Sequence, residues 1–318
     1  TNSENSQNIR DSCLIKKEKT ILKAWIHAIR LRTLPLAFSS SLLGSFIAFH
    51  DKSFKWSVLW LALLTTLFLQ ILSNLANDYG DSRNGADNPE RVGPERAVQS
   101  GVISPGEMRL AVILTGFFAF VSGILLIGEG IGYTVTYKWI LFLVLGTGAI
   151  AAAINYTVGK KPYGYMGFGD LFVFLFFGLT GVLGTYFLHA GHLRSDLLLP
   201  ASAMGFLSAA VLNLNNMRDI QGDSRAGKRT LVVIMGPNRA RYYHLLLIAG
   251  APVTLIVYTI VNYSGPVQYI FLLTLPLLLM HLLSVFSIKV PAELDPQLKR
   301  LALTIFATII IFGIGLIF

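Results

Sequence analysis

The sequence predicts an all-α integral membrane protein with nine transmembrane helices around a central cavity that opens to the cytoplasmic side. Two observations support this fold class. Of the 318 residues, 53% are hydrophobic and only 14% are charged, whereas a soluble domain carries about a quarter charged residues. The charged residues are also bunched, which leaves long stretches without any. Because a membrane-spanning helix needs roughly 20 apolar residues, these stretches are the candidate spans.

Nine stretches free of Asp, Glu, Lys and Arg are long enough to be spans. The segment "NYSGP" (262–266) marks a turn, and it divides one uncharged run, 242–288, into the seventh and eighth spans. An odd number of spans places the two termini on opposite sides of the membrane. The predicted spans are 33–50, 56–77, 110–128, 139–159, 171–190, 197–217, 242–262, 267–288 and 301–318.

The distribution of basic residues orients these spans. With the N-terminus inside, 22 of the 26 Lys and Arg residues fall in inside segments, and the exceptions are Lys52, Lys55, Lys138 and Arg194. Cytoplasmic loops are enriched in Lys and Arg, so the N-terminus is predicted to be cytoplasmic. Topology thus explains most of the net charge of +9, and no nucleic-acid partner is needed.

The chain ahead of the first span is expected to differ from the rest. Residues 1–20 are polar and form a flexible tail, while 21–318 form a single transmembrane domain. Residues 21–32, which include Trp25, indicate an interfacial helix that leads into the first span. The single cysteine, Cys13, lies in the tail, which excludes a disulfide framework and a thiolate metal site.

Acidic and amide residues follow the second and the sixth spans, both on the predicted inside. The first loop reads "NDYGDSRNGADNPERVGPERAVQSG" (77–101), and the second begins within "NLNNMRDIQGDSRAGKRTL" (213–231). Asn215, Asp219 and Asp223 are spaced i, i+4, i+8, which places them on one helix face over about 12 Å. The likeness of the two clusters indicates a weak internal repeat that relates spans two and six.

The first cluster has the same kind of spacing. Asn77 and Asp81 are i, i+4, and Asp78 and Asp81 are i, i+3. Gly85 is predicted to end this helix, so that Asp87 reaches back from the loop. Carboxylates at a helix C-terminus are disfavoured by the helix dipole, and partial burial at a membrane boundary adds to the cost. Two such clusters on one side therefore indicate a function.

The residue types indicate which function. Oxygen ligands without His or Cys are typical of a hard divalent cation, above all Mg²⁺, which completes its coordination with water and substrate phosphate oxygens. Metal and basic side chains together neutralise a diphosphate that carboxylates alone would repel. The basic residues close to the acids are Arg83, Arg96, Arg218, Arg225, Lys228 and Arg229.

These motifs resemble the UbiA superfamily of intramembrane aromatic prenyltransferases. The first cluster is similar to its NDxxDxxxD-type motif, the second to its DxxxD motif, and the likeness covers about residues 20–318. The strongest resemblance is to the menaquinone branch, the MenA-type 1,4-dihydroxy-2-naphthoate polyprenyltransferases. Its segments here are "RTLPLAFSSSLLGS" (32–45), "NDYGDSRNGAD" (77–87), "ERAVQSGVIS" (95–104), "YTVGKKPYGYMGFGDLFVFLFFG" (156–178) and "NNMRDIQGDSRAGKRTL" (215–231).

The chain departs from the superfamily pattern at two places. A strict motif would have its third acid at position 85, which is Gly85, whereas Asp87 stands two positions on, as suits the menaquinone branch. The superfamily's YxxxK pattern fits Tyr156 and Lys160, while the pattern of the branch fits Lys161 better. Both lysines are therefore kept as candidates.

The resemblance implies an activity. It implies transfer of a polyprenyl group from polyprenyl diphosphate to 1,4-dihydroxy-2-naphthoate with loss of CO₂, which gives demethylmenaquinol in menaquinone (vitamin K2) biosynthesis. It also implies Mg²⁺ as cofactor, with two ions expected. The implied location is the bacterial cytoplasmic (inner) membrane, among membrane lipid, with the active site on the cytoplasmic side.

The resemblance also assigns roles to residues. Those expected to be catalytic are Asp81, Asp219, Asp223, Lys160, Lys161 and Tyr156. Those expected to bind metal are Asn77, Asp78, Asp81, Asp87, Asn215, Asp219 and Asp223. The diphosphate is expected to contact Arg96, Arg218, Lys228 and one of Lys160 and Lys161. For the aromatic acceptor, the candidates are Tyr156, Asp170 and Gln99.

Two alternatives remain open from the sequence. Another superfamily member would use 4-hydroxybenzoate, homogentisate or haem as acceptor, and the acceptor that becomes prenylated discriminates between these enzymes. A secondary transporter would place its acids near the bilayer midplane, whereas these acids lie at span ends on one side. Soluble prenyl synthases share aspartate-rich chemistry but lack nine apolar spans.

Overall fold

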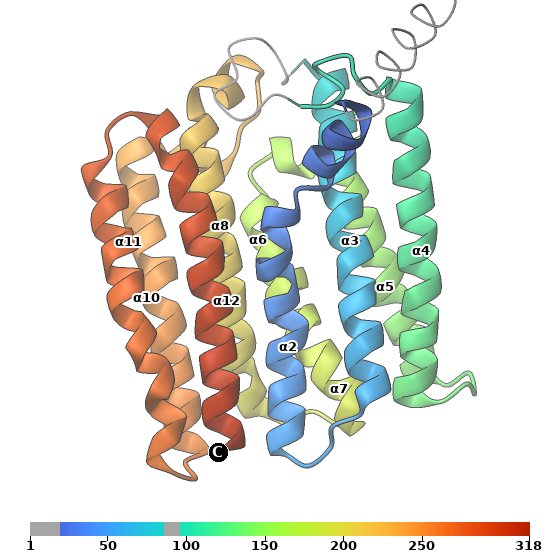
Figure 1. Ribbon diagram of the computed structural model, residues 1–318, viewed down its shortest axis with the longest axis vertical. Helices are drawn as coiled ribbons and strands as arrows, with labels where there is room; N and C mark the ends of the chain where they lie inside the picture. Colours follow the sequence, from blue (N-terminus) through green and yellow to red (C-terminus); the bar gives the residue numbers. More distant parts are fainter. Residues whose placement is uncertain (1–19, 86–95) are drawn as a thin grey trace, which may run out of the picture.

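The computed structural model describes residues 20–85 and 96–318. Within these ranges every regular element is helical, and nine helices are long and apolar enough to cross a membrane, as the sequence predicts. The helices run side by side along the long axis of the molecule (Figure 1). Cys13 and Asp87 lie outside the described residues.

The first four crossings are single long helices after a short N-terminal part. A helix over 20–29 is followed by Arg30, whose backbone is left-handed (φ 55°) and separates it from the first crossing. The elements are the 3₁₀ turn η1 (Leu31–Thr33), α2 (Leu34–His50), α3 (Trp56–Arg83), α4 (Pro105–Ile131) and α5 (Tyr137–Asn155).

The remaining crossings are more irregular. The fifth consists of α6 (Gly169–Val173), the π-helix η3 (Phe174–Leu183) and α7 (Gly184–Ala190), after the 3₁₀ turn η2 (Tyr163–Tyr165). The others are η4 (Ser195–Leu197) with α8 (Leu198–Arg225), α10 (Pro237–Val261), η5 (Pro266–Thr274) with α11 (Leu275–Ser287), and η6 (Pro291–Leu294) with α12 (Asp295–Ile317). A short helix, α9 (Leu231–Met235), precedes α10.

Helices α3 and α8 continue past the uncharged runs that predicted spans two and six. They end at Arg83 and Arg225, so the acidic residues occupy the last helical turns, as their helical spacing predicts. Shortly beyond each end stands a glycine in the left-handed region, Gly85 (φ 73°) and Gly227 (φ 69°). A left-handed glycine is a common way to end a helix, and Gly85 stands just beyond the end of α3, as the sequence predicts.

The two acidic helices also match each other in detail. Each has 28 residues and each ends in Gly-Asp-Ser-Arg, at 80–83 in α3 and at 222–225 in α8. Asp81 therefore corresponds in position to Asp223. This match supports the proposal that spans two and six derive from an internal repeat, with a register set by these two aspartates.

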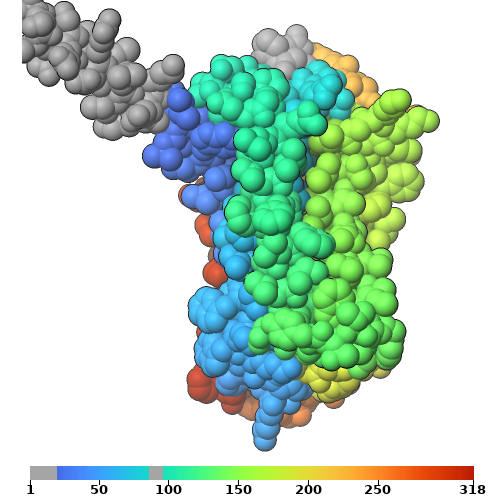
Figure 2. Space-filling model, turned by 90° about the vertical axis from the view of Figure 1, so that its right-hand side faces the viewer, coloured from blue at the N-terminus to red at the C-terminus, as the bar shows by residue number. Residues whose placement is uncertain are grey.

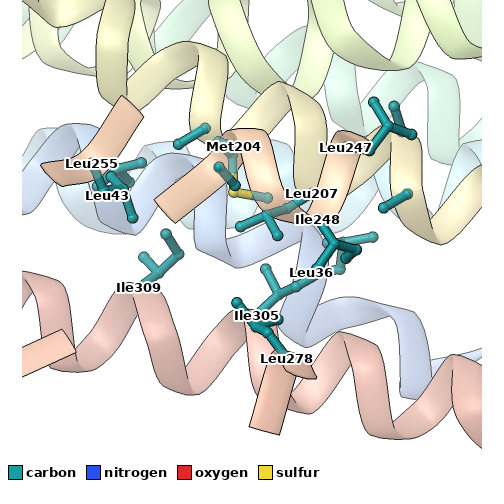
Figure 3. Packing of buried hydrophobic residues seen from close by; sticks show 14 of the residues in the cluster. Leu36, Leu43, Met204, Leu207, Leu247, Ile248, Leu255, Leu278, Ile305 and Ile309 are labelled. Carbon is teal, nitrogen blue, oxygen red and sulfur yellow. The ribbon is translucent and has the colours of Figure 1, made fainter. Parts of the chain in front are cut away.

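The apolar packing falls into two parts on either side of α2. The larger core joins α2 to α8, α10, α11 and α12, with Leu43, Met204, Ile248 and Ile309 among its members (Figure 3). A smaller core joins α3 and α4 to the helix over 20–29. In a bilayer such contacts are stabilised by close packing, because lipid tails solvate apolar side chains as well as a protein core does.

The outward faces of α4 and α5 are apolar. On α4, Ile113 and Phe117 are more than half exposed, and on α5 so are Leu141 and Val144. Figure 2 shows both helices at the surface of the molecule. Exposed apolar side chains of this kind on spanning helices are consistent with contact to lipid, and the chain is an integral membrane protein.

The fifth crossing lies against α8 at a contact between backbones. A Cβ added to Gly178 would lie 2.6 Å from the Cα of Gly205 and 2.7 Å from the carbonyl oxygen of Ala201. Small residues allow helices in membranes to approach this closely. The contact fixes the π-helix beside α8, where it forms one wall of the cavity described below.

A polar network closes the end of the bundle where α3 begins and α7 ends. Asp51 accepts hydrogen bonds from Tyr186 (2.6 Å) and Arg194 (3.2 Å). Arg194 also pairs with Asp196 at 3.2 Å, and Asp196 accepts a hydrogen bond from Asn262. These bonds join the connections α2–α3, α7–α8 and α10–α11, so this end is held together by charge-assisted hydrogen bonds.

The Gly178 contact predicts a loss of stability on overpacking. Gly178→Val should lower the free energy of unfolding by about 1–3 kcal/mol, because the new side chain meets the backbone of α8. Gly148→Val on α5 is the matched control, since a Cβ there meets nothing within 4 Å. Thermal unfolding in detergent measures both variants. Equal melting temperatures for the two would contradict the contact.

Candidate functional site

The two acidic clusters lie at the same end of the bundle, here called the acidic end. Helices α3 and α8 run in the same direction and finish at the top of Figure 1. Between their last turns is Lys228, from the turn that follows α8. Its Nζ lies 3.5 Å from Asp223 Oδ1, and it interacts electrostatically with Asp81 as well. One cation therefore joins carboxylates from two distant parts of the chain.

Asp81 is held by further groups. Arg96 Nη1 lies 2.8 Å from its Oδ2, and the hydroxyl of Tyr165 donates to its Oδ1 at 2.7 Å. The residue is only 2% exposed. A carboxylate buried to this extent needs paired cations and hydrogen-bond donors to remain charged, and Arg96, Lys228 and Tyr165 supply them.

Lys228 is also buried, at 7% exposure. Burial disfavours its charged form, but the carboxylates of Asp81 and Asp223 outweigh that effect and hold the pKa of Lys228 above its usual range. Its Nζ lies 5.3 Å from the ring centre of Tyr165 and 5.9 Å from that of Tyr156. Burial raises the pKa of Tyr156 to about 12, so at neutral pH the phenol is neutral and the lysine is charged.

The rest of the first cluster is attached to the neighbouring connections. Asp78 is 1% exposed, and its Oδ2 accepts a hydrogen bond from the amide of Ala97 at 3.2 Å. Asn77 Oδ1 accepts one from the hydroxyl of Thr157 at 3.2 Å. A Cβ at Gly80 would come within 2.5 Å of that hydroxyl oxygen. The connection after α5 therefore lies directly on α3 and orients the Asn77 amide.

The second cluster is organised around Arg218, which is 2% exposed. Its guanidinium donates to both carboxylate oxygens of Asp219, at 2.8 and 2.6 Å, and to Asn215 Oδ1 at 2.9 Å. It also donates to Asp295, the first residue of α12, at 2.5 Å. Bidentate pairing of this kind fixes both partners, so Arg218 links α8 to α12 in this state.

Two cavities meet at the acidic end. The main cavity has a volume of about 410 Å³ and extends from the acidic end along α3, α4, α5 and the fifth crossing. The second cavity, of about 230 Å³, lies between residues 26–32 and the acidic end. At the acidic end the main cavity is lined by Asn77, Asp81, Arg96, Tyr156, Asn215 and Lys228, and the charged lining of the second is Arg30, Arg32, Asp78, Arg96 and Arg218.

Ion pairs occupy much of the carboxylate surface at the acidic end. In the described part of the chain, no three His, Cys, Asp or Glu side chains converge as a metal centre. Within the described residues, however, the buried acceptor oxygens that have no hydrogen-bond donor include Asp78 Oδ1, Asp223 Oδ2 and Asn216 Oδ1. Carboxylate and amide oxygens accept but cannot donate, so these atoms suit a hard cation or its water, and the residues fit Mg²⁺.

The remaining predicted residues lie in different surroundings. Lys160 and Lys161 are exposed and outside the lining of both cavities. Asp170 is 6% exposed and shares a hydrogen bond with Tyr243, also outside both linings. Gln99 Oε1 accepts a hydrogen bond from the amide of Arg96 at 3.3 Å. Among the predicted lysines, the structure thus brings Lys228 to the acids.

Sequence reasoning missed four residues that contact the acidic groups or line the cavities there. Tyr165 and Thr157 contact the first cluster, Asp295 contacts the second, and Arg30 lines both cavities. Tyr165 and Thr157 lie in the quoted block 156–178, but nothing in their spacing distinguishes them. A signal for Arg30 exists only in the structure: non-glycine residues in the left-handed region are uncommon and cluster at functional sites.

The fold and the site together define a class of protein. It is an integral membrane helical bundle with a cavity that is charged at one end and apolar along its length, suited to an amphiphile with an anionic head. The chain belongs to the UbiA prenyltransferase family, which it matches over residues 37–314.

Similar proteins include relatives from two bacteria. A protein of Haemophilus influenzae, named 1,4-dihydroxy-2-naphthoate octaprenyltransferase, is 43% identical over 93% of this chain and 96% of its own length. A protein of Escherichia coli with the same name is 42% identical over 92% of this chain and 95% of its own length. The match therefore covers almost the whole of each protein.

Solved structures share the fold. The apo structure of a UbiA homolog from Aeropyrum pernix K1 superposes with a TM-score of 0.64 at 19% identity, covering 92% of this chain and 97% of the other. A UbiA homolog from Archaeoglobus fulgidus, bound to GPP and Mg²⁺, gives a TM-score of 0.61 at 19% identity, with 90% and 98% covered. At these identities the likeness establishes the architecture.

Because of the position of Lys228, its replacement by an uncharged residue is predicted to lower the free energy of unfolding strongly. Lys228→Met leaves the Asp81 and Asp223 carboxylates buried without their shared cation, which should cost about 3–5 kcal/mol. Lys160→Met, in an exposed position on a neighbouring connection, should change stability by less than about 0.5 kcal/mol. Thermal unfolding of the purified variants provides the measurement, and equal shifts for the two would show that Lys228 is not part of this network.

Proposed function

We propose that this protein transfers a polyprenyl group from polyprenyl diphosphate to 1,4-dihydroxy-2-naphthoate, with loss of CO₂, to give demethylmenaquinol in menaquinone biosynthesis. The observation that carries this proposal is the identity of 43% to the Haemophilus influenzae enzyme over nearly the full length of both chains. The cavity adds physical support, since its charged end and apolar walls match a prenyl diphosphate in polarity.

The oxygen ligands at the acidic end would hold Mg²⁺, and we propose two ions. The proposed ligands come from both helices, which is why the pairing of Asp81 with Asp223 across Lys228 matters. When bound, the metal supplies positive charge that stabilises the leaving diphosphate. The ligand set is Asn77, Asp81, Asn215, Asp219 and Asp223, with Asp78 and Asp87 as helpers.

The cations at the acidic end would bind the diphosphate oxygens. Arg96 and Lys228 line the main cavity and are paired with carboxylates here. With those carboxylates holding a divalent cation, the same side chains would donate to phosphate oxygens instead. Arg218, held by Asp219 and Asp295, would act in the same way from the second cavity. Lys160 or Lys161 would reach the diphosphate from the exposed connection.

The second cavity is suited to the anionic aromatic acceptor. Its lining includes the guanidinium groups of Arg30 and Arg32, which can pair with a carboxylate. Both arginines also line the main cavity, so an acceptor bound there would lie beside the diphosphate end of the prenyl donor. Tyr156 lines the main cavity at the same end, while Gln99 and Asp170 would act through Arg96 and Tyr243, which they contact.

Side chains that line the cavity would then assist the breaking and forming of bonds during the transfer. Arg96 and Lys228 stabilise charge on the diphosphate as the allylic C–O bond breaks. The electron-rich ring carbon forms the new C–C bond, and the ring regains its aromatic character as CO₂ leaves with its bond electrons kept by the ring. The apolar walls keep water away from the allylic carbon.

Charge supports the orientation. The acidic end is also the end of the predicted inside segments, which hold 22 of the 26 Lys and Arg residues. Because cytoplasmic loops are enriched in these residues, we propose that the N-terminus and the acidic end face the cytoplasm, in the cytoplasmic (inner) membrane of a bacterium.

Purified protein in detergent tests the activity directly. With octaprenyl diphosphate, 1,4-dihydroxy-2-naphthoate and Mg²⁺ it should form the prenylated product, and EDTA should abolish the reaction until Mg²⁺ is restored. Asp81→Asn and Asp219→Asn should each lower kcat on the order of 100-fold, because a ligand charge is lost. The control Glu129→Gln, an exposed position at the opposite end, should stay near wild type.

These variants can also refute the assignment. Near-normal transfer by both folded Asp→Asn variants would contradict the metal site. Prenylation of 4-hydroxybenzoate or homogentisate in preference to the naphthoate would contradict the acceptor.

A further inference from the structure

The first turn of α12 carries a carboxylate that contacts two separate parts of the acidic end. Asp295 is the first residue of α12, where the helix N-terminus favours negative charge. Its Oδ1 lies 2.5 Å from Arg218 Nη1 on α8, and its Oδ2 lies 3.8 Å from Arg32 Nη1 in η1. The two oxygens of one side chain therefore face arginines from distant segments of the chain.

The surroundings of Asp295 fix its position but keep it away from any ligand. The residue before it, Leu294, is 3% exposed and belongs to the larger core, and Gln297 in the same turn is also buried. Asp295 lines neither cavity, whereas Arg218 lines the second cavity and Arg32 lines both. The carboxylate thus contacts the two arginines from outside the cavities, and the guanidinium groups are what a ligand would meet.

A comparison of the two acidic helices shows why Arg218 needs a second carboxylate. In the register that matches Asp81 with Asp223, Ala76 and Asn77 of α3 correspond to Arg218 and Asp219 of α8. Helix α8 thus has a buried cation where α3 has a methyl group. Asp219 accepts two hydrogen bonds from this cation, but Asp219 is also a proposed metal ligand.

A divalent cation held by Asp219 would compete with Arg218 for the same carboxylate oxygens. In the described part of the chain, Asp295 is the other carboxylate that pairs with Arg218. A buried charge is costly without a partner of opposite charge. Asp295 would therefore keep Arg218 compensated, and in its present direction, when Asp219 turns to the metal.

We propose that Asp295 is a positioning residue for both substrates, which holds Arg218 toward the diphosphate and Arg32 toward the carboxylate of the acceptor. It touches neither substrate and acts through the two arginines. An anchored guanidinium loses less side-chain entropy when it pairs with an anion, so Asp295 strengthens the binding of both. This inference rests on the proposed function, which assigns the diphosphate to Arg218 and the acceptor carboxylate to Arg32.

The two contacts differ in strength, which predicts effects of different size. The pair with Arg218 is short, and the Arg218 side chain is 2% exposed. The pair with Arg32 is longer, and its side chains are 40% and 34% exposed. Hydrogen bonds between buried charged groups contribute more than exposed ion pairs do. Loss of the Asp295 charge should therefore weaken diphosphate binding more than acceptor binding.

The same connection provides a matched control. Glu293 lies two residues before Asp295 in η6 and is exposed, and its side chain pairs with no cation among the described residues. Glu293→Gln removes the same charge from the same segment, so it measures the effect of net charge alone. Asp295→Glu keeps the charge at the original position and measures the need for a carboxylate.

The readout is the pair of KM values, measured with Mg²⁺ present. Asp295→Asn should raise KM roughly tenfold for octaprenyl diphosphate and roughly threefold for 1,4-dihydroxy-2-naphthoate, with kcat near that of wild type because binding alone is weakened. Glu293→Gln should keep both KM values, and Asp295→Glu should bring both back close to wild type. A merely structural role would lower kcat through loss of folded enzyme and leave both KM values unchanged.

Unchanged KM values in folded Asp295→Asn would overturn the proposal, and so would an equal rise of both in Glu293→Gln. If Asp295→Asn does not fold, Asp295→Ser is judged by the same two KM values.

Failure of the proposed function would look different. Wild-type protein that forms no prenylated product would contradict the activity itself. Asp295 is then tested by calorimetry with farnesyl diphosphate and Mg²⁺, and with 1-hydroxy-2-naphthoate and 1-naphthol, which differ in the carboxylate. Asp295→Asn should weaken binding of the diphosphate and the naphthoate and leave that of 1-naphthol unchanged. Equal weakening of the naphthoate and 1-naphthol, or unchanged affinity for both anions, would overturn the positioning role.

Discussion

The structure depends on the compensation of buried negative charge at one end of a membrane bundle. Asp81 and Asp223 come from helices 142 residues apart in sequence, and Lys228 lies between them. Buried carboxylates are tolerated only with paired cations and donors, so the turn after α8 and the connection after α5 must come together at the acidic end. That requirement fixes how α3 and α8 are positioned relative to each other along the axis of the bundle. It thereby positions the walls of the main cavity and the residues around its charged end.

The same charges explain how one site can be stable and reactive. Three ion pairs neutralise carboxylates at the acidic end: Arg96–Asp81, Lys228–Asp223 and Arg218–Asp219. In the proposed reaction a metal–diphosphate complex would bring both signs of charge, so each carboxylate and each cation would be able to exchange its partner for the ligand. The unpartnered oxygens of Asp78 and Asp223 show that compensation is incomplete. Away from this end the lining of the cavity is mainly apolar, and the backbone contact at Gly178 holds the π-helix beside it.

Much of this could be predicted from the sequence, for identifiable reasons. The nine spans follow from uncharged runs, and the paired clusters follow from carboxylates that the helix dipole disfavours. Helices α3 and α8 continue beyond these runs, as the helical spacing of their acids and the glycine at position 85 predict, because ion pairs and hydrogen bonds allow the polar turns to remain helical. The choice among lysines could not be predicted: Lys228 reaches the acids through a turn with a left-handed Gly227. Tyr165 reaches Asp81 through tertiary packing, which leaves no pattern in sequence.

We propose that carboxylates from α3 and α8 form one site for a divalent cation and a diphosphate. Calorimetry of farnesyl diphosphate binding tests it without turnover, in wild type and in Asp223→Asn. In wild type, Mg²⁺ should tighten diphosphate binding by roughly tenfold or more, and the diphosphate should tighten Mg²⁺ binding by the same factor, because coupling between sites is reciprocal. Asp223→Asn should largely remove the coupling. Diphosphate affinity in wild type that is equal with and without Mg²⁺ would contradict the claim.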